Sequence, residues 1–314
     1  MVTCPVCSSQ VSLVLELPAS FIKAQLSTFY HDHIPQLDIV DYQLYRCANC
    51  TLEFCDPMLP GSGNFYEWII HQPNYYPLFR WEWGVCLDFF QKAVSGAPRI
   101  FEVGCGNGDF LRFLKRNQIS AIGVDTSVSA VKVARVRELD AHALDIDAYI
   151  SQHPEDKSRF DYAVSFHCLE HVDDPLSFVR SMQSMIHDKG RLLISTPFSP
   201  MCYESMWYDP LNHPPHHMTR WNFKAYEVLA NKIGMGIRFH FPEAQSLLQR
   251  TIRAISFKLN GFQLFLSKKQ IFLYILKNPL VFFREYSNQK QRLKMYDRYA
   301  ADVVLAEFYY DDKI

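Results

Sequence analysis

Four of the nine cysteines form two C-x2-C pairs, Cys4 with Cys7 and Cys47 with Cys50, and 39 residues separate the pairs. Each pair can fold into a tight turn that points two thiolates at one ion, and two such turns close a tetrahedral site. The spacing therefore predicts a structural zinc ion bound by these four cysteines. Residues 1–60 carry two basic and six acidic residues, a balance of −4, whereas a zinc module that binds nucleic acid is normally basic. We interpret the module as a scaffold or a substrate lid.

A second group of residues surrounds a glycine-rich loop at residues 104–108, which has the pattern G-x-G-x-G. A loop that binds a dinucleotide would need a glycine at position 109, where Asp109 stands. Glycines let the backbone approach a ligand without a Cβ clash. Glu102 precedes the loop, Asp125 ends the next apolar segment and Asp145 follows the one after that. A carboxylate in the position of Asp125 can accept hydrogen bonds from both hydroxyls of a ribose, which favours a nucleoside ligand.

These residues lie on a regular alternation of strands and helices. Apolar strands are predicted at 99–103, 121–124, 141–144, 161–166 and 191–195, and helices at 109–117, 127–138 and 175–187. This alternation predicts a parallel sheet with helices on both faces and a ligand at the carboxyl ends of the strands. Three further predictions are a helix at 81–94, an irregular linker at 61–77, and short strands at 11–17 and 42–46.

Three segments together resemble the class I S-adenosylmethionine-dependent methyltransferases, over residues 99–243. Residues 101–108 (FEVGCGNG) resemble the first motif of that family, 123–126 (GVDT) its ribose motif, and 160–175 (FDYAVSFHCLEHVDDP) its fourth-strand motif. The resemblance implies S-adenosylmethionine as cofactor, with its methionine end against the glycine loop. The implied binding residues are Glu102, Gly104, Cys105, Gly106, Asn107 and Gly108 around the loop, Asp125 and Thr126 at the ribose, Asp145 and Ile146 at the adenine, and His167 and Leu169 beside the methyl group.

The same resemblance implies an α/β fold with a seven-stranded, doubly wound sheet whose last strand is antiparallel. Residues 235–241 fit the sixth strand and 302–310 the seventh, so 244–301 becomes an insertion between them. The predicted organisation is a zinc module at 1–60, a linker with a lead-in helix at 61–97, the donor-binding core at 98–243, a helical insertion at 244–301 and the final strand at 302–314.

Three histidines follow the fifth predicted strand: His213, His216 and His217, with two prolines among them. The loop after this strand overhangs the donor, and methyl transfer needs an acceptor held in line with the methyl group and away from water. A hydroxyl acceptor must also lose its proton, which a neutral imidazole can take near pH 7. We therefore predict His217 as the base, with His216 and His171 positioning the acceptor. The alternative is that these histidines pack the loop or bind a metal adventitiously.

This loop carries a second resemblance, to zinc-containing deoxysugar C-methyltransferases, which join an amino-terminal cysteine module to the same domain. Their Tyr-His-Glu-His segment ends in a histidine that acts as base and aligns with His217. His216 stands at the glutamate, and Pro214 and Pro215 stand at the tyrosine and first histidine, so sugar binding is implied more strongly than C-methylation. In the ubiquinone-pathway methyltransferases a metal-binding glutamate stands at the position of His167, so no catalytic metal is predicted.

The insertion has a distinctive composition. Residues 249–298 carry eleven Lys and Arg against two acids, a balance of +9, interleaved with large apolar residues. Pro279 is expected to divide the run into two helices. Basic charge combined with apolar side chains is typical of a helix that lies in a membrane interface. The alternative is a helical cap over the acceptor site, and both remain open.

Composition limits the class of protein. With 48% apolar and 21% charged residues among 314, and a formal charge of −1, the chain is expected to be globular, with no net field that steers it to nucleic acid. No secretory signal or uncharged spanning run is evident, and an odd number of cysteines favours reduced thiols. A cytoplasmic protein is expected, peripheral to the inner face of the membrane if the insertion binds there.

The favoured interpretation is an enzyme that methylates a hydroxyl, or a carbon, of a sugar, a glycan precursor or a related small molecule, carried on a nucleotide or lipid. One alternative is an RNA methyltransferase with a zinc recognition module. The acidic module and the absence of an Asn-Pro-Pro-Tyr type sequence after the fourth strand argue against it. The other alternative, a donor-binding regulatory module without turnover, leaves the histidine loop without a purpose.

Overall fold

The structure of the chain is a computed structural model. It describes residues 2–30, 38–70, 72, 79–92, 96–204, 206, 208–243, 245–260, 268–295 and 301–310.

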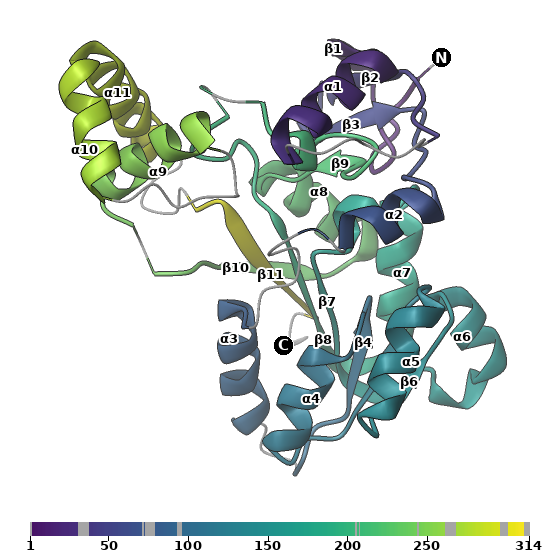
Figure 1. Cartoon of the computed structure of the whole chain (residues 1–314). Coiled ribbons are helices and arrows are strands. Elements are labelled where there is room, and N and C mark those ends of the chain that lie inside the picture. The colour runs from purple at the N-terminus through teal and green to yellow at the C-terminus, as the bar shows by residue number, and fades with distance from the viewer. Residues whose placement is uncertain are drawn as a thin grey trace.

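A seven-stranded mixed sheet forms the centre of the molecule (Figure 1), with strand order β10-β11-β8-β7-β4-β5-β6. Strand β11 is antiparallel to both of its neighbours, and the other neighbouring pairs are parallel. This order and the single reversed strand confirm the predicted fold class. The strands are β4 (Ile100–Val103), β5 (Ala121–Val124), β6 (Ala141–His142), β7 (Phe160–Phe166), β8 (Ile186–Pro197), β10 (Gly236–His240) and β11 (Val303–Tyr309).

Helices cover both faces of this sheet, because alternate residues of each strand point to opposite sides. Phe101 and Ala163 pack with α6 (Ile146–Gln152), α7 (Pro175–Met185) and α8 (Phe223–Ile233) in one core cluster. Their neighbours Ile100 and Val164 pack with α3 (Trp81–Gln91) and α4 (Asp109–Arg116) in another. A third cluster holds α5 (Val128–Val136) against the sheet edge. Helix α7 ends two residues before the predicted end, because β8 already begins at Ile186.

A second sheet, with strand order β1-β2-β3-β9, forms the amino-terminal module. Its first three strands are β1 (Val11–Leu17), β2 (Tyr42–Cys47) and β3 (Glu53–Asp56), and α1 (Ala19–Tyr30) packs beside them. The fourth strand, β9 (Thr219–Arg220), comes from the segment after β8 and pairs antiparallel with β3. The sheet therefore joins the cysteine pairs to the histidine loop.

The expectation of an irregular linker at 61–77 is wrong over part of that range. Helix α2 occupies Gly63–Ile70. Phe65 and Ile69 lie one helical turn apart, and both are buried against the amino-terminal module. Apolar residues at this spacing favour a helix once a surface is present to cover them.

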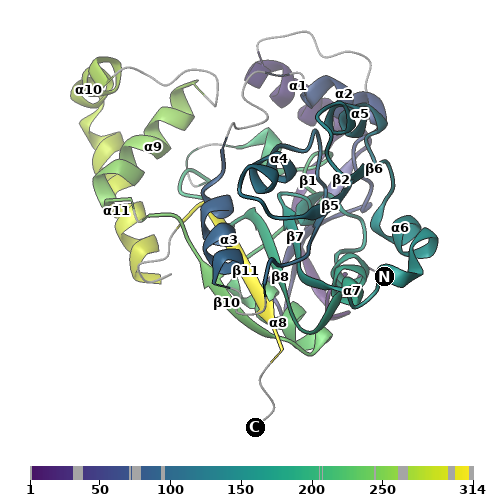
Figure 2. The same cartoon turned by 90° about the horizontal axis from the view of Figure 1, so that it is seen from below.

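The described residues of the insertion form three helices rather than two: α9 (Leu247–Asn260), α10 (Lys268–Lys277) and α11 (Pro279–Met295). Pro279 opens α11, so the predicted break at this residue is confirmed. In both views these helices lie together at one side of the molecule, apart from the helices that cover the sheet (Figures 1 and 2). No helix among the described residues is long and apolar enough to span a membrane.

Candidate active site and metal site

The glycine loop lies between β4 and α4, where its conformation requires glycine. Gly104, Gly106 and Gly108 have φ values of 79°, 52° and 78°, in the left-handed region that side chains disfavour. A Cβ on Gly108 would also lie 2.6 Å from the Leu139 side chain and 2.9 Å from Ala134 Cβ. The loop therefore leaves its backbone free of side chains at these three positions, next to the carboxyl end of β4.

Asp125 directly follows β5 and faces this loop. Its two carboxylate oxygens accept hydrogen bonds from the N–H groups of Gly106 and Ser127, each at 2.8 Å. Burial raises the pKa of Asp125, and these two N–H groups partly oppose that shift. Each oxygen keeps a lone pair, so the carboxylate can bind two neighbouring hydroxyls while the loop stays in place.

Other residues implied for the donor site differ in their surroundings. Asp145 is exposed and caps α6, accepting a hydrogen bond from the Ala148 N–H at 2.7 Å. Glu102 is buried, and burial first, then the charges of Asp125 and Asp109, raise its pKa well above the ordinary value. Leu169 is fully buried in the main core cluster, and its role beside the methyl group stays a prediction.

Replacing Asp125 with alanine is expected to weaken binding of S-adenosylmethionine by about 1–3 kcal/mol, through loss of two charge-assisted hydrogen bonds. Isothermal titration calorimetry measures this directly. Asp140→Ala is the matched control, because Asp140 is an exposed carboxylate that pairs with His142 one strand away. Unchanged affinity in a folded Asp125→Ala protein would exclude Asp125 as the ribose ligand.

A cluster of three histidines lies between the end of β7 and the loop after β8. His171 belongs to a short 3-10 helix (Leu169–His171), and His216 and His217 follow another, Pro210–Asn212. The ring centroids of His171 lie 4.6 Å from His216 and 4.8 Å from His217. The fold therefore brings together all three residues predicted for the acceptor side, although 45 residues separate His171 from His216 in the chain.

The orientation of His217 is fixed by a chain of hydrogen bonds that the sequence does not reveal. Asn212 donates from Nδ2 to Glu204 Oε1 at 2.7 Å, so its Oδ1 faces His217 Nδ1 at 3.1 Å as an acceptor. His217 Nδ1 therefore carries the proton, and Nε2 keeps a free lone pair. Burial, then the neighbouring His216 and His171, lower the pKa of His217 well below its ordinary value. The imidazole is neutral near pH 7 and available as a proton acceptor.

A buried carboxylate, Glu170, lies beside this cluster. Its Oε1 is 4.0 Å from His217 Nε2 and 3.5 Å from His167 Nδ1, and the side chain is 1% exposed. His167 also contacts Glu82 of α3, with 3.1 Å between Nε2 and Oε1. Burial opposes charge on His167, yet Glu170 and Glu82 raise its pKa above the ordinary value. No motif points to Glu82, which is 85 residues from His167 in the chain.

One nitrogen from each histidine of the cluster lies within 4.8 Å of the others, a separation at which they could share an ion. His171 Nδ1, however, lies 2.6 Å from the His216 carbonyl oxygen, so this nitrogen donates a hydrogen bond. The His171 and His216 rings are also stacked, 25° from parallel. The expectation that this site uses no catalytic metal stays a prediction.

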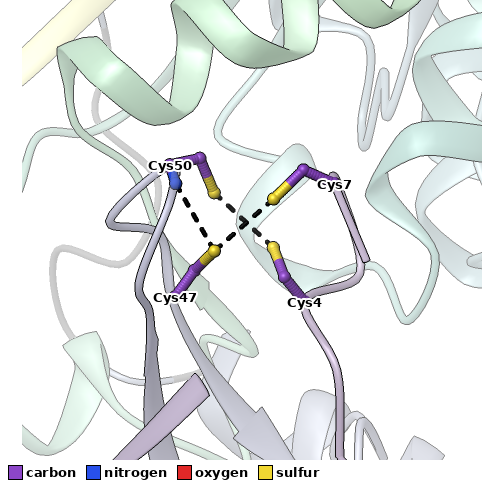
Figure 3. Close-up of side chains that lie close together, drawn as sticks. All are labelled: Cys4, Cys7, Cys47 and Cys50. Atoms are coloured by element: carbon purple, nitrogen blue, oxygen red, sulfur yellow. Dashed lines mark hydrogen bonds between the residues drawn. The ribbon is translucent and has the colours of Figure 1, made fainter. Parts of the chain in front are cut away.

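The four cysteines of the two pairs point toward one centre (Figure 3). The Sγ atoms of Cys4 and Cys50 are 3.5 Å apart, those of Cys7 and Cys47 are 3.4 Å apart, and all four lie within 4.8 Å of one another. A tetrahedral zinc site with bonds of about 2.3 Å has sulfur separations of about 3.8 Å. The donor set and its spacing therefore fit a structural zinc ion.

The two pairs have matching backbones. In each turn the first cysteine N–H donates to the carbonyl five residues later, from Cys4 to Ser9 at 3.1 Å and from Cys47 to Leu52 at 2.9 Å. The residue after each pair, Ser8 or Thr51, has a φ of 59°. Two equivalent turns thus present their thiols in the same way.

The cysteine module also contacts the histidine loop through polar groups. The Cys55 N–H donates to the Met218 carbonyl at 2.9 Å, next to His217. Arg220 of β9 bridges Glu53 of β3 at 3.1 Å and Glu204 at 2.8 Å, and Glu204 is the residue that orients Asn212. The position of the proposed base therefore depends on the strand that follows the second cysteine pair.

The sheet order defines a fold of the Rossmann-like class. The glycine loop follows β4 and the Asp125 carboxylate follows β5, so both lie at the carboxyl ends of neighbouring parallel strands. Residues 83–249, more than half of the chain, match the methyltransferase domain family, and the chain belongs to that family.

Curated relatives share part of this domain. The ubiquinone biosynthesis O-methyltransferase of Alkalilimnicola ehrlichii is 30% identical over 120 residues, covering 35% of this chain and 47% of that protein. The enzyme of the same name from Xanthomonas campestris pv. campestris is 34% identical over 119 residues, covering 36% and 48%. The chain thus spans about half the length of these relatives. A solved SAM-dependent methyltransferase from Archaeoglobus fulgidus is 16% identical with a TM-score of 0.49, covering 72% of this chain and 91% of that one.

Proposed function

We propose that this enzyme transfers a methyl group to a hydroxyl of a polar small molecule, with a sugar or glycan precursor as the acceptor class. The observation that carries the proposal is the histidine cluster, in which His216 is buried and the His217 side chain, 10% exposed, has a fixed tautomer and a free Nε2. S-adenosylmethionine supplies an electrophilic methyl group on a sulfonium. Its expected ligands are the glycine loop and Asp125, and the proton of the acceptor hydroxyl passes to His217 Nε2.

The remaining residues of the cluster position the acceptor and exclude water in this proposal. The hydroxyl oxygen of Tyr66, on α2, lies 3.4 Å from His171 Nδ1. The Tyr66 ring packs against the rings of His171 and His216. The Glu170 carboxylate, 4.0 Å from His217 Nε2, stabilises the imidazolium that forms when the proton is taken. Many polar groups in a buried site favour an acceptor with several hydroxyls.

We further propose that Cys4, Cys7, Cys47 and Cys50 bind a structural zinc ion that supports the acceptor side of the site. The contacts of β3 with β9 support this assignment of roles. The acidic balance of residues 1–60 favours a scaffold over an RNA-binding surface.

A phenolic hydroxyl is the second candidate acceptor, because the curated relatives are named as ubiquinone biosynthesis O-methyltransferases. A phenol uses the same proton acceptor but needs flat apolar walls rather than several polar partners.

An acceptor panel separates these candidates. The purified full chain is incubated with S-adenosylmethionine and either nucleotide-linked sugars or polyhydroxylated phenols, and release of S-adenosylhomocysteine is followed. We expect turnover with a nucleotide-linked sugar, and an O-methyl signal in the NMR spectrum of the product. Turnover with phenols alone would show that the acceptor is a phenol and not a sugar. A new C-methyl signal in the product would show that the methyl group is transferred to carbon and not to oxygen. A reaction without the protein serves as the blank.

A further inference from the structure

Helices α10 and α11 expose large apolar side chains on their outer surface. Phe272 and Leu276 of α10 are 61% and 60% exposed, and Leu280 and Phe283 of α11 are 82% and 66% exposed. Residues 272 and 276 are one turn apart, as are 280 and 283, so each helix presents an apolar face. We name these four side chains the outer apolar face.

The inner side of α11 is polar instead. Glu285 and Gln289 are fully buried, and Gln289 donates a hydrogen bond to the Cys202 carbonyl of the segment after β8. Arg250 of α9 is buried beside them, with its Nε 3.3 Å from Gln289 Oε1. A helix on a water-soluble surface normally buries its apolar stripe and exposes its polar one. Helix α11 shows the reverse pattern: it exposes apolar residues near its start and buries polar residues farther along.

The exposed charged side chains of α10 and α11 have one sign. Seven Lys and Arg residues fall within α10 and α11, and the single acid of these two helices, Glu285, is buried. Lys269, Lys277, Arg284 and Lys290 are exposed. Among the side chains of α10 and α11 that the structure describes, the accessible charges are therefore all basic.

We propose that the outer apolar face of α10 and α11 binds the surface of an anionic lipid bilayer. Exposed apolar patches ringed by polar groups mark interaction sites, and the basic charge selects a negatively charged partner. A bilayer interface accepts apolar side chains below its head groups, while anionic head groups attract the lysines and arginines. A nucleic acid would match the charge but not the phenylalanines and leucines. This inference does not depend on the acceptor proposed above.

Vesicle sedimentation tests the proposal. The full chain is mixed with vesicles of phosphatidylcholine alone or of phosphatidylcholine with phosphatidylglycerol. Binding is expected only to the anionic vesicles, and it should weaken as salt rises. Combined Leu280→Ser and Phe283→Ser should reduce vesicle affinity more than tenfold, since two large side chains lose their burial in the bilayer. Combined Lys277→Glu and Lys290→Glu should reduce it more than tenfold as well, because each lost positive charge alone weakens binding about fivefold.

The matched control is Val128→Ser with Val136→Ser on α5, since these side chains are 71% and 78% exposed and lie beside Lys132 and Arg135. This variant should bind vesicles as the wild type does. Circular dichroism establishes that each variant is folded, which the exposure of all substituted side chains favours. Equal binding to neutral vesicles, or full binding by the Leu280→Ser, Phe283→Ser protein, would refute the proposal. Self-association that disappears in this variant, without vesicle binding by the wild type, would show that the face pairs two copies of the chain.

Discussion

Replacing His217 with alanine is expected to lower turnover by about 10²–10⁴-fold, the usual contribution of a general base. The imidazole is held by Asn212 with Nε2 free, and burial keeps it neutral near pH 7. Removing it leaves the proton of the acceptor hydroxyl without the base that is oriented to take it. Affinity for S-adenosylmethionine should barely change, because the residues expected to bind the donor all lie between Glu102 and Leu169 and none lies on this loop.

The Asn212→Ala protein is the matched comparison, because it keeps the imidazole but loses the acceptor for Nδ1. We expect a smaller loss, mainly in kcat, because the other tautomer places a proton on Nε2 and blocks it. Steady-state kinetics with the true acceptor and calorimetry with the donor measure both variants. A His217→Ala protein that methylates at nearly the wild-type rate would remove His217 from the mechanism.

The pH dependence of kcat/KM also tests whether His217 is the base. Burial lowers the pKa of His217 well below the ordinary value of 6.5. Since the base acts unprotonated, kcat/KM should stay level as pH falls through 6.5 and decline only at the lower pKa. The plot of kcat/KM against pH for the residual activity of His217→Ala should lack this decline at low pH. A decline in kcat/KM centred at or above pH 6.5 would mean that a group other than His217 acts as base.

The second large effect is expected from the cysteine site. Structural zinc binds with roughly 10–16 kcal/mol at pH 7 in small zinc modules, so losing one ligand should lower the free energy of unfolding on the order of 5 kcal/mol. Cys47→Ser should therefore lose zinc, unfold at lower temperature and lose activity together. Activity is included because β3, six residues after Cys47, pairs with β9 next to His217.

Metal analysis of freshly purified protein should find about one zinc per chain, and less in Cys47→Ser. Cys86→Ala is the control, because Cys86 is equally buried but lies on α3, outside the four-cysteine cluster. It should keep both zinc and activity, with only a small loss in stability. A Cys47→Ser protein that retains full zinc would exclude this ligand set.

Features fixed by neighbours in the chain could be predicted from the sequence. The loop at 104–108 is dictated by the conformations that its glycines alone adopt easily, and Asp125 follows directly from the end of β5. The geometry of the two C-x2-C turns was enough to predict that the two cysteine pairs bind one ion together. Strand β5 was predicted with its observed bounds, because a short apolar run ending in an acid specifies it locally.

Features that depend on distant contacts could not be predicted in this way. Helix α2 gains its stability from burial of Phe65 and Ile69 against the module. Glu82 meets His167 because α3 packs on the same face of the sheet as the end of β7. The pairing of β9 with β3 has no periodicity of its own, since two residues are too few to show one. Tertiary structure alone therefore decided that the cysteine module, Asn212 and His217 belong to one site: hydrogen bonds and ion pairs between segments far apart in the chain leave no local pattern.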